Sequence, residues 1–82
     1  MKYKPRYTLE AATRIRKLHA EVKRLARAAF DRLQESPLDG HTLRDELAGL
    51  RSYRLGKYRI IYRINEREST FDILLFGHWH AI

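Results

Sequence analysis

The sequence predicts a single α+β domain in which an N-terminal strand and helices pack on a small, twisted antiparallel sheet. Two patterns predict it: apolar residues recur at helical spacing in the first half of the chain and at alternate positions in the second half. The 82 residues are 44% hydrophobic and 33% charged, a composition that suits one core beneath a charged surface. We therefore expect residues 1–82 to form one domain.

The first half of the chain begins with strand and helix-start signals. Residues 4–7 suit a short strand in which Pro5 favours an edge position, and the Thr8 hydroxyl suits a helix N-cap. Two apolar stripes at helical spacing follow: Leu9, Ala12, Ile15 and Leu18, then Val22, Leu25, Ala26, Ala29, Phe30 and Leu33. No glycine or proline separates the stripes, so one long helix and a helical hairpin are both open, and Ser36-Pro37 ends the pattern.

The second half contains three runs rich in aromatic and β-branched residues, which predict strands at residues 51–55, 58–65 and 70–77. Gly56-Lys57 and the polar residues 65–69 are the expected turns. Alternation divides the middle strand into two faces, with Tyr58, Ile60, Tyr62 and Ile64 on one and Arg59, Ile61 and Arg63 on the other. The expected core is Leu9, Ile15, Leu18, Val22, Leu25, Ala29, Leu33, Ile60, Tyr62, Ile73 and Leu75.

The chain is strongly basic. Seventeen Lys and Arg against 10 Asp and Glu give a formal net charge of +7, and no acidic residue lies between Arg51 and Arg63. A field of this sign attracts polyanions, either nucleic acid or an acidic protein. No apolar run approaches the roughly 20 residues of a membrane-spanning helix, and the N-terminal residues lack a signal-peptide pattern. We therefore expect a cytoplasmic protein with no membrane partner.

Several classes of chemistry are excluded by residue type and spacing. The chain has no cysteine, which removes disulfide scaffolds, thiolate zinc sites and thiol nucleophiles. It has no glycine-rich phosphate loop, and no ligand spacing for a metal is found among His41, His78 and His80. We therefore expect neither a metal nor a cofactor.

The residues that suit chemistry are arginines presented on strands. Arg59 and Arg63 project from one strand face, and Arg54 on the neighbouring strand can lie beside them. Guanidinium groups bind phosphate in a bidentate manner and stay charged at any relevant pH. The same pattern also fits a solvated sheet face whose arginines pair with Glu66, Glu68 and Asp72.

The segment from Leu47 to Tyr62 resembles the core motif of the RelE/ParE superfamily of type II toxins. It reads Leu47-Ala48-Gly49-Leu50 and then Gly56-Lys57-Tyr58-Arg59-Ile60-Ile61-Tyr62, which follows the family pattern Gly-x-Tyr-Arg, two aliphatic residues and Tyr. The segment Ile73-Leu74-Leu75-Phe76-Gly77-His78 resembles the family's last strand and its Gly-His corner. The resemblance spans essentially the whole chain and implies a RelE-like fold in the order β-α-α-β-β-β. It also implies a cognate antitoxin, RelB-like or other, encoded nearby.

In the RelE branch of this superfamily, the toxin cuts mRNA in the ribosomal A site without a metal, so the resemblance implies an endoribonuclease (mRNA interferase). By position, Arg59 is the main phosphate-binding arginine, Arg54 is a second basic group, and His41 stands where one relative carries a carboxylate base. The alternative interpretation is that His41 is a loop histidine after Gly40 with no catalytic role. Further catalytic candidates, as replacement proton donors, are His78 and His80. The RNA-binding candidates are Arg51, Lys57, Arg63 and Trp79.

Two departures from the RNase branch keep other interpretations open. Trp79 occupies a position that usually holds arginine, and a tyrosine common near the C-terminus is absent up to Ile82. The ParE branch lacks the RNase residues and inhibits DNA gyrase by protein contact, so the alternative function is gyrase inhibition, with His78 and Trp79 as packing residues. A third interpretation is a binding module that holds RNA without cutting it.

Overall fold

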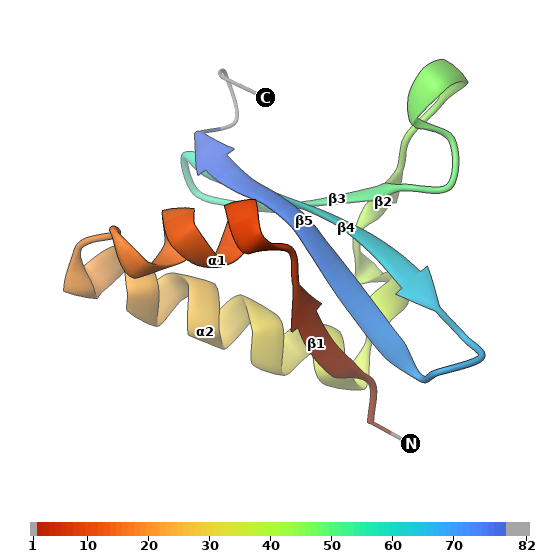
Figure 1. Cartoon of the computed structure of the whole chain (residues 1–82), viewed down its shortest axis with the longest axis horizontal. Helices are drawn as coiled ribbons and strands as arrows, with labels where there is room; N and C mark the ends of the chain where they lie inside the picture. The colour runs from red at the N-terminus through yellow and green to blue at the C-terminus, as the bar shows by residue number, and fades with distance from the viewer. Residues whose placement is uncertain (1, 79–82) are drawn as a thin grey trace.

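The computed structural model describes residues 2–78 and confirms the predicted class, because two helices cover one face of a five-stranded sheet (Figure 1). The elements are β1 (Lys4–Tyr7), α1 (Leu9–Arg16), α2 (Ala20–Glu35), η1 (Pro37–Asp39), β2 (His41–Thr42), η2 (Asp45–Leu47), β3 (Arg51–Leu55), β4 (Tyr58–Asn65) and β5 (Thr70–His78). The predicted strand boundaries therefore hold within one residue, and the short strand β2 is an addition. Neither helix in residues 2–78 is long and apolar enough to cross a membrane.

The sheet is mixed rather than purely antiparallel. Its strand order is β1-β5-β4-β3-β2, and β1 pairs with β5 in parallel while the other neighbouring strands are antiparallel. Parallel neighbours need a long connection, and here every other element of the fold lies between β1 and β5 in the chain. The opening strand can therefore return to the sheet as an edge beside the last one.

Two helices, rather than one long helix, follow β1. The predicted N-cap is confirmed, because Thr8 Oγ1 accepts a hydrogen bond from Ala11 N at 3.1 Å, and it also donates to Leu74 O on β5 at 3.1 Å. At the end of α1, Leu18 N bonds to Ile15 O at 3.2 Å in a tighter, 3₁₀-type turn. His19 then adopts an extended conformation (φ −62°, ψ 155°), which separates the two helices.

Two leucines of the predicted core are in fact exposed. Leu9 is 82% exposed because the inward position of the first α1 turn belongs to Ala11, whose small side chain allows α1 to lie close to the sheet. Leu25 is 52% exposed because it is rotated about 100° from Ala26, which faces the sheet. Phe30 completes the inner face of α2.

A bulge in β5 explains the other error in the predicted core. Ile61 pairs with Leu75 whereas Tyr62 pairs with Ile73, so Leu74 is an extra residue in β5. This insertion reverses the alternation, with the result that Ile73 and Phe76 face the helices and Leu75 faces away from them. The predicted faces of β4 are confirmed, because Ile60 and Tyr62 are fully buried against the helices.

Tyr62 also fixes the segment that leads into β2. Its hydroxyl donates to Pro37 O at 2.6 Å and accepts from Gly40 N at 3.0 Å. Burial raises the pKa of Tyr62 above its ordinary value of 10.0, so the hydroxyl keeps the proton that the first bond requires. Gly40 lies so close to the ring that a Cβ at this position would be 2.9 Å from Tyr62 Cε1 and 3.0 Å from Ser52 O. Tyr62, the final tyrosine of the sequence motif, therefore has a structural role: its hydroxyl anchors the segment between α2 and β2 to β4.

Candidate nucleic-acid interface

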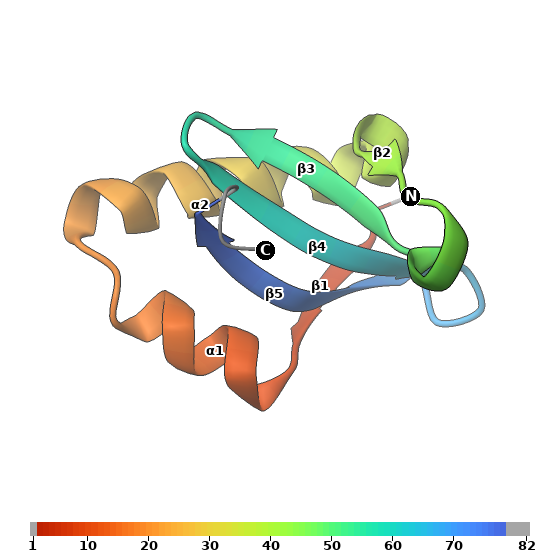
Figure 2. The ribbon, with the colours of Figure 1, turned by 90° about the horizontal axis from the view of Figure 1, so that it is seen from above.

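Most of the candidate arginines lie on the face of the sheet that turns away from α1 and α2, which we call the open face. Figure 2 looks onto this face of the sheet. Residues directly opposite each other on antiparallel strands share a face. Because Ile60 and Tyr62 point into the core, their neighbours on β4 and the partners of those neighbours point outward. The open face thus carries three cross-strand pairs: Arg54 with Arg59, Ser52 with Ile61, and Arg63 with Asp72.

Arg54 and Arg59 form a directly opposed pair of like charges. They flank the turn between β3 and β4, in which Gly56 adopts a positive φ of 60° and Lys57 is exposed. Arg54 Nε donates to Gly56 O at 3.2 Å. On its other side, Arg59 pairs with Gly77 of β5. Like charges directly opposite each other destabilise a strand pair, and an anion bound between them relieves this repulsion.

An apolar cavity of about 380 Å³ lies beside Arg59 on the open face. Its floor is formed by Ile61, Leu74 and Leu75 of the sheet, and its wall by leucines of the segment around η2, which rises above the sheet (Figure 1). Those leucines are Leu43, Leu47 and Leu50. Apolar surroundings lower the local dielectric constant, so Arg59 attracts a negative charge here more strongly than it would in water.

The remaining basic candidates lie in other surroundings. Arg63 contributes to the open face but donates from Nη2 to Asp72 Oδ2 at 3.4 Å, which is one of the acidic pairings expected for a solvated sheet face. Arg51 pairs with Tyr62 and therefore faces the helix side, where its Nη1 donates to Gly40 O at 2.8 Å and to Leu38 O at 3.3 Å. The geometry thus separates Arg51 from the cluster of Arg54, Lys57 and Arg59.

The histidines are divided between the two faces. His41 pairs with Ser52 and is exposed on the open face, two strands and two residues from Arg59, which corresponds to roughly 12 Å between Cα atoms. His78 pairs with Tyr58 and shares its face, with the two ring centroids 5.9 Å apart. Only His41 of these two therefore shares a face with Arg59. The candidates Trp79 and His80 lie outside the described residues.

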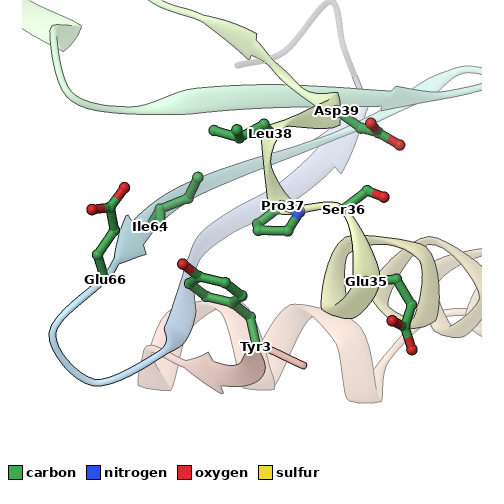
Figure 3. Close-up of a pocket in the computed structure, with 8 residues that line it drawn as sticks. All are labelled: Tyr3, Glu35, Ser36, Pro37, Leu38, Asp39, Ile64 and Glu66. Carbon is green, nitrogen blue, oxygen red and sulfur yellow. The ribbon is translucent and has the colours of Figure 1, made fainter. Parts of the chain in front are cut away.

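A second cavity, of about 370 Å³, lies near the end of α2 and has the opposite electrostatic character (Figure 3). Three carboxylates line it, those of Glu35, Asp39 and Glu66, around an apolar surface that includes Tyr3 and Ile64. Carboxylates repel a phosphate backbone. Of these two cavities, the one beside Arg59 is therefore the candidate site for nucleic acid.

Asp72 holds together three strands at the other end of the open face. Its Oδ1 accepts from Arg6 Nε of β1 at 3.1 Å and from Thr70 Oγ1 at 3.2 Å, while Oδ2 accepts from Arg63 of β4. Burial acts to raise the pKa of this carboxyl, but the hydrogen bond and charge of Arg6, together with Thr70 and Arg63, outweigh burial and hold the pKa below 3.8. Asp72 is therefore a charged, structural carboxylate at neutral pH.

We expect Asp72→Asn to destabilise the protein in a pH-dependent way. Because the folded-state pKa lies below the unfolded-state value, the carboxylate stabilises the fold above about pH 4 and loses this effect as the pH falls through the folded-state pKa. The substitution should lower the free energy of unfolding by about 2 kcal/mol at neutral pH and by progressively less between about pH 5 and pH 3. Urea unfolding of both proteins across this range measures the difference, and a constant difference would contradict the assignment.

Two parts of this surface do not follow from the sequence patterns described above. Arg6 reaches Asp72 only because β1 pairs with β5 in parallel, a long-range contact that local patterns do not encode. The cavity wall was also missed, although three leucines at positions 43, 47 and 50, between the predicted elements, were a signal that this segment packs on apolar surface.

Comparisons with known proteins identify the family and the fold of the chain. The sequence model of a family described as ParE toxin of type II toxin–antitoxin system, parDE, matches residues 6–80. The chain is 39% identical over 80 residues to Toxin RelG of Mycobacterium tuberculosis, covering 95% of this chain and 92% of that protein. A chain of the toxin–antitoxin complex RelBE2 from the same species superposes with a TM-score of 0.87 at 38% identity, covering 95% of this chain and 92% of that one. A mutant of the E. coli toxin RelE in the free state superposes with a TM-score of 0.84 at 21% identity, covering 99% of this chain and 87% of that one. At this identity, the likeness shows the fold alone.

Proposed function

The chain belongs to the ParE toxin family of type II toxin–antitoxin systems, and we propose that this toxin stops translation in the cytoplasm by cutting ribosome-bound mRNA. The observation that carries the proposal is the opposed pair of Arg54 and Arg59 beside the apolar cavity of the open face. Guanidinium groups in this arrangement suit a phosphodiester, with Arg59 on the low-dielectric side. Lys57, which is exposed in the adjoining turn, adds further positive charge.

The proposed reaction is an internal transfer within the RNA. The 2′-oxygen attacks the adjacent phosphorus and forms a new P–O bond, the bond from phosphorus to the 5′-oxygen breaks, and that oxygen takes up a proton. The products are a 2′,3′-cyclic phosphate and a 5′-hydroxyl. Arg59 binds the non-bridging oxygens, on which negative charge builds in the transition state, and Arg54 supports it from the neighbouring strand. The guanidinium groups supply the positive charge for a metal-independent reaction.

Proton transfer in this reaction needs a base for the 2′-hydroxyl and an acid for the 5′-oxygen. His41 is the proposed base because it shares the open face with Arg59 and imidazole exchanges protons near neutral pH. The separation of roughly 12 Å between Cα atoms leaves room for a nucleotide between the two side chains. His80, which lies outside the described residues, is the proposed source of the proton for the leaving group, because His78 shares the face of Tyr58 and lies on the opposite side of the sheet from Arg59.

The partners proposed for this toxin are a cognate antitoxin and the ribosome with its mRNA. The superposable chain from M. tuberculosis comes from a toxin–antitoxin complex, and the intact RelBE complex of E. coli has the same fold in its toxin. A net charge of +7 favours an antitoxin with an acidic binding segment.

Inhibition of DNA gyrase is the second candidate function. It is favoured by the family model itself, which is that of a ParE toxin and matches residues 6–80. Such an inhibitor acts by protein contact, so it does not require Arg54 and Arg59 to share one face with an apolar cavity. The arginine pair is the reason for placing mRNA cleavage first.

Two assays with the same purified toxin decide between these functions. We expect the toxin to arrest protein synthesis in a cell-free translation reaction and to leave gyrase supercoiling of a relaxed plasmid unchanged. Arrest of supercoiling with normal translation would establish the gyrase inhibitor instead. Salt-dependent RNA binding without arrest of either process would establish a binding module and overturn both functions.

A further inference from the structure

We propose that Arg6, Arg63 and Asp72 form a second phosphate-binding site, which holds the RNA backbone on the open face at a distance from the scissile phosphate. This inference rests on the proposed function, because it extends the RNA path away from Arg59. Sequence patterns single out Arg63 alone, whereas the site needs Arg6 from the opposite end of the chain.

In this site, two guanidinium groups bind the same carboxylate. Arg6 uses Nε and Arg63 uses Nη2 to reach the two oxygens of Asp72, at 3.1 and 3.4 Å. Each guanidinium has five N–H donors, so each keeps four that do not serve these contacts. The Asp72 side chain is 10% exposed, whereas those of Arg6 and Arg63 are 54% and 56% exposed. The Asp72 carboxylate is therefore buried, whereas the guanidinium N–H groups that do not bind it face solvent.

Charge distinguishes this cluster from the other ion pairs in residues 2–78. The contacts of Lys2 with Glu35, Arg14 with Glu10 and Arg32 with Asp39 each join one cation to one carboxylate. Asp72 holds two arginines, so the cluster retains a net positive charge. A cavity of about 220 Å³ lies against these three side chains and is also lined by Tyr7, Thr8 and Leu74. A positive cluster beside an open cavity suits an anionic ligand.

The position of the cluster favours an RNA backbone over an acidic peptide. Arg63 follows Arg59 by four residues on β4, and both belong to the open face, about 13 Å apart along the strand. A strand of RNA whose scissile phosphate lies at Arg59 can therefore place another of its phosphates at Arg63 and Arg6. The positions of Arg59 and Arg63 on β4 therefore set the line along which the RNA backbone crosses the sheet.

The test measures binding of two uncleavable RNAs, a 2′-O-methyl octanucleotide and a 2′-O-methyl dinucleotide, by fluorescence anisotropy over a range of salt concentrations. The dinucleotide has a single phosphodiester and can fill only one of the two sites. The variants are Arg6→Gln and Arg63→Gln, with Arg32→Gln as the matched control because Arg32 is also exposed and paired with a carboxylate. Circular dichroism checks that every variant is folded at the temperature of the assay.

We expect Arg6→Gln and Arg63→Gln each to weaken octanucleotide binding about tenfold and to reduce the salt slope by about one, while dinucleotide binding and Arg32→Gln remain at the wild-type level. Equal weakening of both RNAs, or wild-type octanucleotide affinity in folded variants, would refute the second site. Loss of binding to an octaglutamate peptide with unchanged RNA binding would also refute it, in favour of a protein ligand. Absence of mRNA cleavage by wild-type toxin would instead refute the proposed function, which separates the two failures.

Discussion

Replacing Arg59 with alanine should lower the rate of mRNA cleavage on programmed ribosomes by about 10²- to 10³-fold, because the transition state loses its main source of positive charge. Arg59→Lys should recover part of this rate, since lysine keeps the charge but cannot bind two phosphate oxygens with a planar fork. Single-turnover cleavage of ribosome-bound mRNA measures both rates. The arginine lies beside a cavity and opposite another arginine, so neither change should unfold the protein.

The matched control for this experiment is Arg32→Ala, which removes an equal charge from an ion pair between α2 and η1. It should leave the rate within about a factor of two of wild type, as expected for a surface position. Equal loss of activity in Arg32→Ala and Arg59→Ala would show that the overall charge, rather than the open face, is responsible. Full toxicity of Arg59→Ala would exclude cleavage through this residue and favour gyrase inhibition.

The largest effect on stability is expected for the hydroxyl of Tyr62. Tyr62→Phe leaves the N–H of Gly40 and the carbonyl of Pro37 without their buried partner, which should cost about 3 kcal/mol in the free energy of unfolding. In a domain of this size, that loss lowers the melting temperature by about 15 °C. Tyr7→Phe is the control, because Tyr7 is 46% exposed and should change stability by less than about 0.5 kcal/mol.

A double-mutant cycle tests the same contact from the other side. Gly40→Ala should cost about 2 kcal/mol, because its methyl group would overlap the Tyr62 hydroxyl although its backbone conformation (φ −77°) suits alanine. Combined with Tyr62→Phe, the cost should be smaller than the sum, since removal of the hydroxyl relieves the overlap. Strict additivity in thermal or urea unfolding would show that the two residues do not interact as described.

The strands of this protein were predictable because their signals are local. Alternation along β4 correctly assigned Arg59 to one face and Tyr62 to the other, and Ser36-Pro37 correctly ended α2. The bulge at Leu74 was not predictable, because it depends on how β5 pairs with β4 and not on its own residues. The prediction that Ile73 faces the core was therefore correct, whereas the same prediction for Leu75 was wrong.

The candidate site shows the same division between local and long-range information. The opposed pair of Arg54 and Arg59 follows from a two-residue turn, so alternation on both strands was sufficient to bring them together. The attachment of Arg6 to Asp72 depends on the parallel pairing of the first and last strands, which no local pattern specifies. The assignment of His78 to the face of Tyr58 likewise depends on register.

The chemistry of the RNA ends tests the central claim most directly. Ribosome-bound mRNA is incubated with wild-type toxin or Arg59→Ala, the cut positions are mapped by primer extension, and the new ends are identified with polynucleotide kinase and RNA ligase. Attack by the 2′-hydroxyl at the open face predicts cuts at A-site codons that leave 2′,3′-cyclic phosphate and 5′-hydroxyl ends, and that disappear with the variant. Uncut mRNA, or 5′-phosphate ends that persist in Arg59→Ala, would contradict this account.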